Sequence, residues 1–222
     1  MTNETETAFS LKDFLLSFGE ILGVLGAGIL VGAIGVIRKK KWNLFKQEKK
    51  ERRFVENHGQ LHEMLTELRV TIRACRCLIF QFHNGGSFAD GTSIKRFSVT
   101  HESCGSSVPS MILESQDVLL TRYMELIRIM DTQPGKIIKT DSLPPCAFRS
   151  GLEINNAEYF SVVPLKCMDG ITPLGFLCCH WCSSESLDEI ESEGVTQENL
   201  EELILQNAAT INTIMSYKPR KN

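Results

Sequence analysis

The sequence lacks the short motifs that mark common classes of hydrolases and phosphate-binding enzymes. It has no Gly-x-Ser-x-Gly nucleophile elbow, no His-Glu-x-x-His zinc motif and no P-loop. The pair Gly85-Gly86 is followed by neither the lysine nor the helix that a P-loop requires. We therefore predict no catalytic residues and no enzymatic activity. The alternative is a thiol-dependent enzyme, which needs a cysteine of lowered pKa near His83 or His101.

The sequence also lacks a strong excess of charge of either sign, with a formal net charge of −3 over 222 residues. This total hides an uneven distribution, because residues 38–53 carry nine Lys/Arg and two Glu, a net +7. Residues 1–37 carry −3 and residues 54–222 carry −7. An acidic globular part is a poor electrostatic match for phosphate backbones, so we predict no nucleic-acid partner.

Charge is absent altogether from Ile21–Ile37, an apolar run of 17 residues. Together with Phe14–Gly19 it predicts a helix over residues 14–37, which at about 1.5 Å per residue is long enough to span a bilayer. A secretory signal has positive charge before its apolar run, whereas here acidic residues precede it and Arg38–Lys41 follows. A buried helix of a soluble core leaves this asymmetry unexplained. We therefore predict an uncleaved transmembrane helix.

The basic residues after the apolar run predict its orientation. By the positive-inside rule, residues 1–13 are a short extracytoplasmic tail and the part after Ile37 is cytoplasmic. The juxtamembrane segment, residues 38–53, offers anionic lipid four consecutive cations, Arg38, Lys39, Lys40 and Lys41. Nuclear localisation or nucleic-acid binding is the alternative interpretation of such a cluster, and the adjacent anchor makes it the weaker one. The prediction is a single-pass membrane protein.

Cysteine spacings typical of a metal site are missing as well. The densest group is Cys178-Cys179-His180-Trp181-Cys182, which matches neither a zinc ribbon nor an iron–sulfur motif. In a strand, Cys178 and His180 would share one face while Cys179 takes the other. We therefore predict no metal and no cofactor. Because a cytoplasmic domain keeps its cysteines reduced, we expect the eight cysteines to be packed thiols without disulfides.

Directly after the basic segment comes a stripe of mostly apolar residues at alternating steps of four and three. Its members are Phe54, His58, Leu61, Leu65, Leu68, Ile72 and Cys75. This spacing is typical of a coiled-coil seam and predicts a linker helix over residues 54–75, within a longer helix that begins near Gln47. We predict that two such helices form a homodimer. The alternative is that the stripe packs on its own domain.

From residue 76 onward the periodicity changes to that of strands and shorter helices. We predict strands at 77–83, 97–102, 136–140, 159–165 and 174–181, and helices at 118–130 and 196–217. Asp117 is the expected cap of the first helix, and Asp169-Gly170 the tip of a hairpin. Residues 141–156 are predicted to form an irregular loop with room for one helical turn. This order predicts an α+β fold in which helices cover one face of an antiparallel sheet.

The order and lengths of these elements resemble those of the GAF domain, a sibling of the PAS fold, over residues 51–217. Phe82-His83-Asn84-Gly85-Gly86, followed by Ser98-Val99-Thr100-His101-Glu102, is similar to a sequence found in small membrane-anchored GAF-like proteins of bacteria and phages. The resemblance implies that residues 76–222 form a GAF-like cytoplasmic domain. It also implies a ligand-binding or signalling module, with a pocket between the sheet and the segments that cover it.

The corner at His83 is the candidate site, because it ends an apolar strand with a titratable ring and a polar turn. Backbone amides and side-chain donors there are suited to a small anionic or nucleotide-like ligand. The predicted ligand-binding residues are Phe82, His83, Asn84, Gly85, Gly86, Ser98, Thr100, His101 and Arg149. The alternative is that these polar residues serve the turn alone.

These features together predict a membrane-anchored, non-enzymatic GAF-like sensor that binds a small molecule or a protein partner. The alternative function is a membrane-acting or scaffold protein, holin-like and phage-encoded, whose GAF-like domain is regulatory or vestigial.

Overall fold

The computed structural model describes the backbone of residues 11–87, 93–167 and 169–216. Within these ranges, the side chains of residues 11–35, 37, 50, 53–54 and 93–94 are not described. The chain divides into two units, Met1–Phe54 and Val55–Asn222. Most of the expected extracytoplasmic tail, residues 1–10, lies outside the described residues.

Helix α1, Leu11–Thr71, runs without interruption through both the predicted anchor and most of the predicted linker. Within the part of the chain that the structure describes, no helix has the length and apolar character that a membrane crossing requires. In the predicted anchor, residues 14–37, the structure describes only the side chain of Val36. The four cations from Arg38 to Lys41 are described and exposed.

The end of α1 is set by a residue in the left-handed region. Arg73 has a φ of +49°, and the amide of Ala74 bonds back to the carbonyl of Arg69. Another carbonyl of this last turn, that of Ile72, accepts a hydrogen bond of 2.9 Å from the indole of Trp181. The helix therefore ends before the predicted position 75, and the chain turns directly into the first strand.

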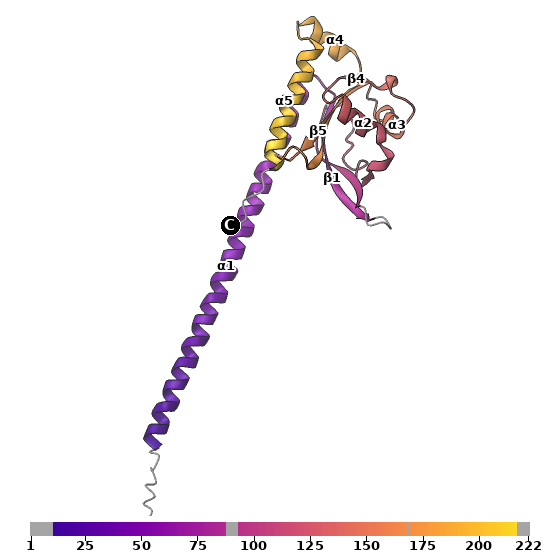
Figure 1. Ribbon diagram of the computed structural model, residues 1–222. Helices are drawn as coiled ribbons and strands as arrows, with labels where there is room; N and C mark the ends of the chain where they lie inside the picture. Colours follow the sequence, from indigo (N-terminus) through magenta and orange to yellow (C-terminus); the bar gives the residue numbers. More distant parts are fainter. Residues whose placement is uncertain (1–10, 88–92, 168, 217–222) are drawn as a thin grey trace, which may run out of the picture. The chain divides into compact units, whose positions relative to one another are not determined.

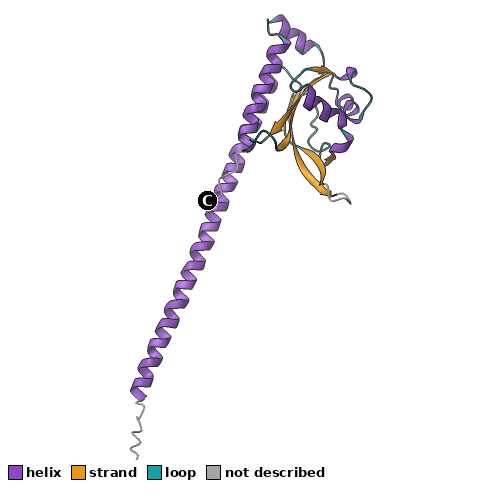
Figure 2. Ribbon diagram, viewed as in Figure 1, coloured by secondary structure: helices purple, strands orange, loops and turns teal. Residues whose placement is uncertain are grey.

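A six-stranded sheet forms the centre of the second unit (Figure 2). Its strands are β1 Arg76–Ser87, β2 Ser93–Cys104, β3 Val118–Leu119, β4 Ile138–Lys139, β5 Tyr159–Lys166 and β6 Pro173–Trp181. They follow the order β3-β2-β1-β6-β5-β4, and every neighbouring pair is antiparallel. The middle of the sheet is the pair β1 and β6, which are apolar on both faces and buried along most of their paired length.

Helices cover both faces of this sheet, not one face as the sequence predicts. On one face, the end of α1 packs with α5, Gln197–Ser216, in a single apolar core (Figure 1). On the other face, α2, Met124–Thr132, and α3, Ala147–Ile154, cover a second core. The reason lies in the alternation of β1, because Cys77 and Ile79 belong to the first core and Leu78 and Phe80 to the second.

The stripe predicted as a dimer seam is buried in its own domain along most of its length. Leu61, Leu65, Leu68 and Ile72 are 0–3% exposed and pack in the first core. These side chains are therefore not available to a second chain. The alternative interpretation, packing on the domain itself, is correct for this part of the stripe. The homodimer itself stays a prediction.

The segment from Val118 to Met130 differs from the predicted helix. Val118–Leu119 pairs with β2 as strand β3, a 3₁₀ turn follows at Leu120–Arg122, and α2 begins at Met124. Asp117, the predicted cap, has a φ of +55° and instead forms an ion pair of 2.7 Å with Arg96. The first two residues of the predicted helix therefore form an edge strand that pairs with β2.

Two further helices go beyond the sequence prediction, which allows one helical turn within residues 141–156 and no helix between residues 181 and 196. The predicted loop 141–156 contains α3, and α4, Glu185–Ser192, follows β6. The terminal helix α5 begins as predicted, because Thr196 and Asn199 bond reciprocally through side chain and backbone amide at 3.1 and 3.3 Å. The Asp169-Gly170 turn is also present, with Oδ1 of Asp169 accepting from the amides of Ile171 and Thr172 at 2.9 Å.

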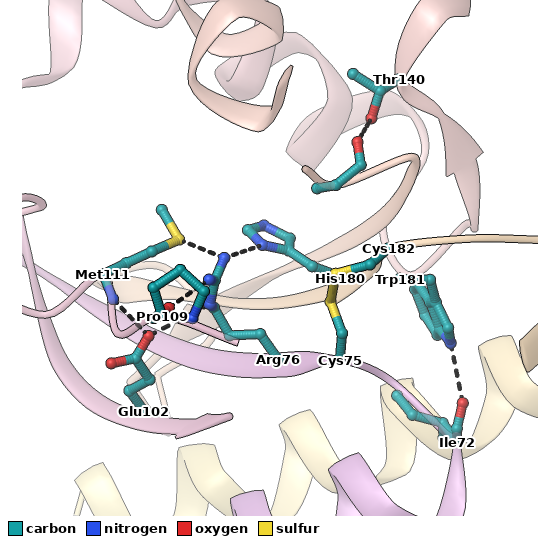
Figure 3. Close-up of a disulfide and its surroundings, with 11 residues drawn as sticks. Ile72, Cys75, Arg76, Glu102, Pro109, Met111, Thr140, His180, Trp181 and Cys182 are labelled. Atoms are coloured by element: carbon teal, nitrogen blue, oxygen red, sulfur yellow. Dashed lines mark hydrogen bonds and ion pairs between the residues drawn. A yellow bond between two sulfur atoms is a disulfide. The ribbon is translucent and has the colours of Figure 1, made fainter. Parts of the chain in front are cut away.

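The structure contradicts the expectation that all cysteines are reduced. Cys75 and Cys182 form a disulfide, with 6.0 Å between their Cα atoms (Figure 3). The register explains the pairing, since Arg76 lies opposite His180 and the two cysteines therefore flank the same end of β1 and β6. The other six cysteines are free. Sequence spacing alone does not reveal this proximity, because 107 positions separate the two residues.

We predict that reduction of Cys75–Cys182 lowers the free energy of unfolding by about 2–4 kcal/mol, because the bond restricts a long loop of the unfolded chain. Urea denaturation with and without reductant measures this difference. The double variant Cys75→Ser/Cys182→Ser should be insensitive to reductant. Thiol alkylation of the unfolded, unreduced protein should modify six cysteines, those outside the pair. Modification of eight would contradict the disulfide.

Candidate ligand-binding site

A cavity of about 180 Å³ lies between the sheet and the helices α2 and α3. Strands β1, β2 and β6 supply its floor, and α2, α3 and the segment before β3 supply the rest. Its lining residues are Phe80, Phe97, Met111, Glu114, Ser115, Val118, Tyr123, Leu126, Phe148, Gly151, Leu152, Ile154, Asn155, Phe176, Cys178 and His180. Most of these side chains are apolar, and several belong to the second core.

Aromatic rings dominate the strand side of the cavity. The rings of Phe80 and Phe176 are stacked, with centroids 4.4 Å apart. Phe97 meets Phe176 edge-on at 5.4 Å and Tyr123 edge-on at 5.3 Å. Phe148 on α3 contributes a further ring to the lining. Such edge and face contacts suit the insertion of another flat apolar group.

Polar groups gather at one end of the cavity around Arg76, which is fully buried (Figure 3). Its Nη2 donates to the carbonyl of Pro109 at 2.6 Å, and its Nη1 donates to the sulfur of Met111 at 2.9 Å. Nε lies 3.4 Å from Oε1 of Glu102 but has no hydrogen-bond partner in the described structure. Burial lowers the pKa of Arg76, and the carboxylate of Glu102 opposes this effect.

Glu102 connects this charge to the segment that precedes β3. Its Oε1 accepts the amide hydrogen of Met111 at 2.8 Å, and its Oε2 accepts the hydroxyl hydrogen of Ser110. The same carboxylate therefore balances Arg76 and holds the backbone of Met111 against the sheet. Removing either partner alone leaves an uncompensated charge in the interior, which is strongly destabilising.

His180 is the second polar group at this end. Burial, followed by the charge of Arg76, lowers its pKa to about 3, so its ring is neutral at pH 7. Nδ1 faces the guanidinium of Arg76 at 3.5 Å, and because arginine only donates, we assign the ring proton to Nε2. Nε2 lies 3.1 Å from the sulfur of Cys178. The histidine is thus held as a neutral ring beside the cavity.

The thiols at the sheet centre have little nucleophilic character. Burial raises the pKa of Cys178 well above its usual range. The pKa of Cys179 is also raised well above that range, through its hydrogen bond with Cys77 and through burial. No group of three or more His, Cys, Asp or Glu is placed to hold a metal ion among the described residues. The arrangement is therefore suited to holding a molecule, with an aromatic wall and a polar end.

The residues predicted at the His83 corner lie at a different place. Phe82, His83 and Asn84 line a second cleft of about 340 Å³ toward the end of the β1–β2 hairpin. His83 bonds Ser98 through Nε2 at 2.9 Å, and Asn84 accepts from Lys95 at 3.0 Å. Gly85 and Gly86 belong to the same exposed part of β1, and Gly86 has a φ of +113°.

The other predicted site residues are also apart from the aromatic cavity. Thr100 donates to the carbonyl of Ile79 at 3.3 Å, where β1 and β2 shift register. His101 faces α1, and its Nε2 lies 2.6 Å from Nδ1 of His58. Arg149 on α3 bonds Glu153 and two carbonyls of the preceding loop. None of the nine predicted residues is among those that line the aromatic cavity.

Sequence reasoning missed Arg76 and the aromatic wall. One signal was present, because Arg76 is a charged residue between two cysteines at the start of an apolar strand. The aromatic residues gave no signal, since they are far apart in the chain. The register of β1, β2 and β6 brings Phe80, Phe97 and Phe176 together, and the placement of α3 adds Phe148.

Comparison of the structure with solved structures gives the fold. A far-red cyanobacteriochrome photoreceptor has 15% sequence identity and a TM-score of 0.50, covering 80% of this chain and 96% of that one. A red/green cyanobacteriochrome in its green-light-absorbing state has 13% identity and a TM-score of 0.49, with 72% and 94% covered. The phycocyanobilin-bound GAF domain of a cyanobacterial phytochrome has 16% identity and a TM-score of 0.44, with 73% and 92% covered.

The sequence comparisons add no family to this result. No protein-family model matches the chain, and none of the curated proteins matches it at a significant level. At such low identities the structural likeness shows the fold alone, and the chain has a GAF-like fold.

We predict that the domain loses stability as the pH falls from about 6.5 toward 4. Burial, with the neighbouring His58 and His62, lowers the pKa of His101 from 6.5 to about 4. Between these values the unfolded chain binds more protons than the folded one, so stability rises with pH and is complete above 6.5. The contribution of His101 to this loss reaches about 3 kcal/mol at most, from about 1.4 kcal/mol per pKa unit.

Urea midpoints measured from pH 4 to 7.5 test this expectation. His101→Gln should flatten the dependence in part, because His180 still contributes. His83→Gln, at an exposed position on the hairpin, is the matched control and should leave the profile unchanged. A wild-type midpoint that is constant between pH 4 and 6.5 would show that the buried histidines do not govern acid stability.

Proposed function

We propose that this protein is a non-enzymatic sensor that binds a small molecule in the aromatic cavity and is tethered to a membrane through α1. The observation that carries the proposal is the cavity itself, which combines an aromatic wall with a polar end where Met111 and His180 contact the buried Arg76. Apolar pockets with a few convergent polar groups are the usual form of small-molecule sites.

Packing energetics support a binding role for this space. Protein interiors are close-packed, and an unfilled cavity destabilises the fold because its lining atoms lose contacts. Here the second core leaves about 180 Å³ open next to Gly151, where an added Cβ would meet no atom within 4 Å. A ligand that fills this space restores those contacts, and its binding stabilises the folded domain.

The structural neighbours support the same class of function. One is a GAF domain bound to phycocyanobilin, and another is a photoreceptor. We propose that this chain shares their use of the fold to hold a small molecule. The nature of the ligand does not follow from them, because identity is 16% or lower in these neighbours.

The membrane tether rests on the sequence of residues 14–37 and on the exposed residues after it. Arg38–Lys41 is exposed, and Trp42 is 60% exposed with Nζ of Lys46 located 5.4 Å from the centroid of its ring. Cations and an amphipathic ring at this position suit the headgroup region of an anionic leaflet. In this proposal the N-terminus is outside, the GAF-like domain is cytoplasmic and parallel tethers favour a homodimer. The Cys75–Cys182 disulfide is then an exception to the reduced state of cytoplasmic cysteines.

We predict that filling the cavity abolishes stabilisation by ligands. Gly151→Leu introduces a side chain into open space beside the cavity, and the helix tolerates leucine. A thermal-shift screen of small aromatic compounds should find ligands that raise the melting temperature of the wild type and not that of Gly151→Leu. Gly59→Leu is the matched control, because Gly59 is also helical and open but lies on α1. A screen without any hit favours the scaffold alternative.

We predict that charges within the apolar run release the protein from membranes. Ile29→Lys/Ala33→Lys places two cations near the middle of the proposed span, and each costs about 3 kcal/mol in the bilayer centre. In fractionated cells the wild type should sediment with membranes and resist carbonate extraction, whereas this variant should not. Val70→Lys, at a 59% exposed position, is the control. A soluble wild-type protein would contradict the tether.

A further inference from the structure

The donors of Arg76 are only partly used by the protein itself. Pro109 provides a strong acceptor for Nη2, but the acceptor for Nη1 is the thioether of Met111, at 2.9 Å. Thioether sulfur is a weak acceptor, and the other hydrogen-bond contact of Nη1 within the described part of the chain is with a ring nitrogen of His180 at 3.5 Å. A buried cation therefore directs a poorly satisfied donor toward Met111 and His180.

Both of these neighbours line the aromatic cavity, whereas Arg76 lies directly behind them. Met111 comes from the segment between β2 and β3, and its unbranched side chain rearranges easily. A molecule in the cavity that displaces the sulfur of Met111 gains direct access to Nη1. The thioether occupies the position of a hydrogen-bond acceptor that a ligand can supply more strongly (Figure 3).

The local charges favour an uncharged acceptor. Glu102 is 6% exposed at its side chain and already balances Arg76, and Glu114 adds a second carboxylate to the cavity lining. A ligand carboxylate would bring another negative charge to a site that holds one buried cation. Its desolvation would therefore lack full compensation. A carbonyl oxygen accepts the same hydrogen bond without this cost.

The volume of the cavity limits the size of the ligand. A dry apolar cavity of about 150 Å³ is sufficient to bind benzene. The space of about 180 Å³ between the rings of Phe80, Phe97 and Phe148 therefore matches one aromatic ring with a small substituent. It is smaller than the roughly 300–1,000 Å³ of sites for drug-sized molecules, so a nucleotide-like ligand is too large for this site.

We propose that the cavity binds an uncharged compound with a single aromatic ring and a carbonyl-type oxygen, which replaces the sulfur of Met111 as the acceptor for Arg76. The ring stacks among the phenylalanines, and the oxygen accepts a hydrogen bond from Nη1 at the place of the thioether. This inference rests on the proposed ligand-binding function and names the chemical class of the ligand.

Three compounds of similar shape test the proposal with the full-length protein in detergent. Acetophenone has the carbonyl, benzoate has the negative charge, and isopropylbenzene has neither. We expect calorimetry to show that acetophenone binds about tenfold more tightly than the other two, as one hydrogen bond to a buried charged donor provides. Equal affinity for acetophenone and isopropylbenzene, or tightest binding of benzoate, would overturn the proposed class.

Two variants should change the preference for acetophenone over isopropylbenzene in opposite directions. Met111→Leu removes the competing acceptor, so the ratio of acetophenone to isopropylbenzene affinity should rise several-fold. Arg76→Met/Glu102→Gln removes both charges together, which avoids an unpaired buried carboxylate, and the ratio should fall to about one. Arg128→Gln, which removes an exposed ion pair on α2, is the control and should not change the ratio. A ratio that is unaffected by Met111→Leu would contradict the role of Arg76, even if the double variant fails to fold.

Failure of this inference is distinguishable from failure of the proposed function. If other compounds stabilise the wild type but not Gly151→Leu, the cavity is a ligand site and only the proposed class is wrong. If no compound stabilises the wild type in the broad screen and none of the three binds, both the class and the binding function are wrong.

Discussion

The pairing of β1 with β6 is the constraint on which the rest of the second unit depends. Both strands are apolar on both faces, so the sheet must be covered on each side to keep them from water. The end of α1 and α5 provide one cover, and α2 and α3 provide the other. At Gly175 the backbones approach so closely that an added Cβ would overlap the carbonyl oxygen of Phe80. The two cores follow from this central pair.

The helices pack differently on the two faces of the sheet. On the α1 side, leucine and isoleucine side chains at helical spacing fill the core, and the indole of Trp181 holds the end of α1. On the α2–α3 side, short helices and a long connection cover large aromatic rings and leave a cavity. Arg76 is the one charged residue at the start of β1, and its need for partners brings Glu102, Met111 and His180 to one end of that cavity.

The sequence predicted those elements that depend on interactions between residues close together in the chain. The strands β1, β2, β5 and β6 and the reciprocal cap of α5 at Thr196 follow from alternation, turn residues and side-chain capping within a few positions. Val118–Leu119 departed from its helical periodicity because an edge position on β2 was available to it. The disulfide escaped prediction because strand register, and not spacing, brings Cys75 to Cys182. Phe82 and His83 lie within strand β1, opposite Phe97 and Arg96 of β2, and not at the predicted turn or at the aromatic cavity.

The sequence by itself determined the α+β class, the antiparallel pairing of its main strands, the helical character of two N-terminal stretches, 14–37 and 54–75, and the sharp division between a basic segment and an acidic domain. These properties depend on composition and on periods of two to seven residues, which can be read along the chain. The tertiary structure decided which residues form the site. Arg76, Phe80, Met111, Phe148 and His180 share no local pattern, and only the register of three strands and the placement of two helices bring them together.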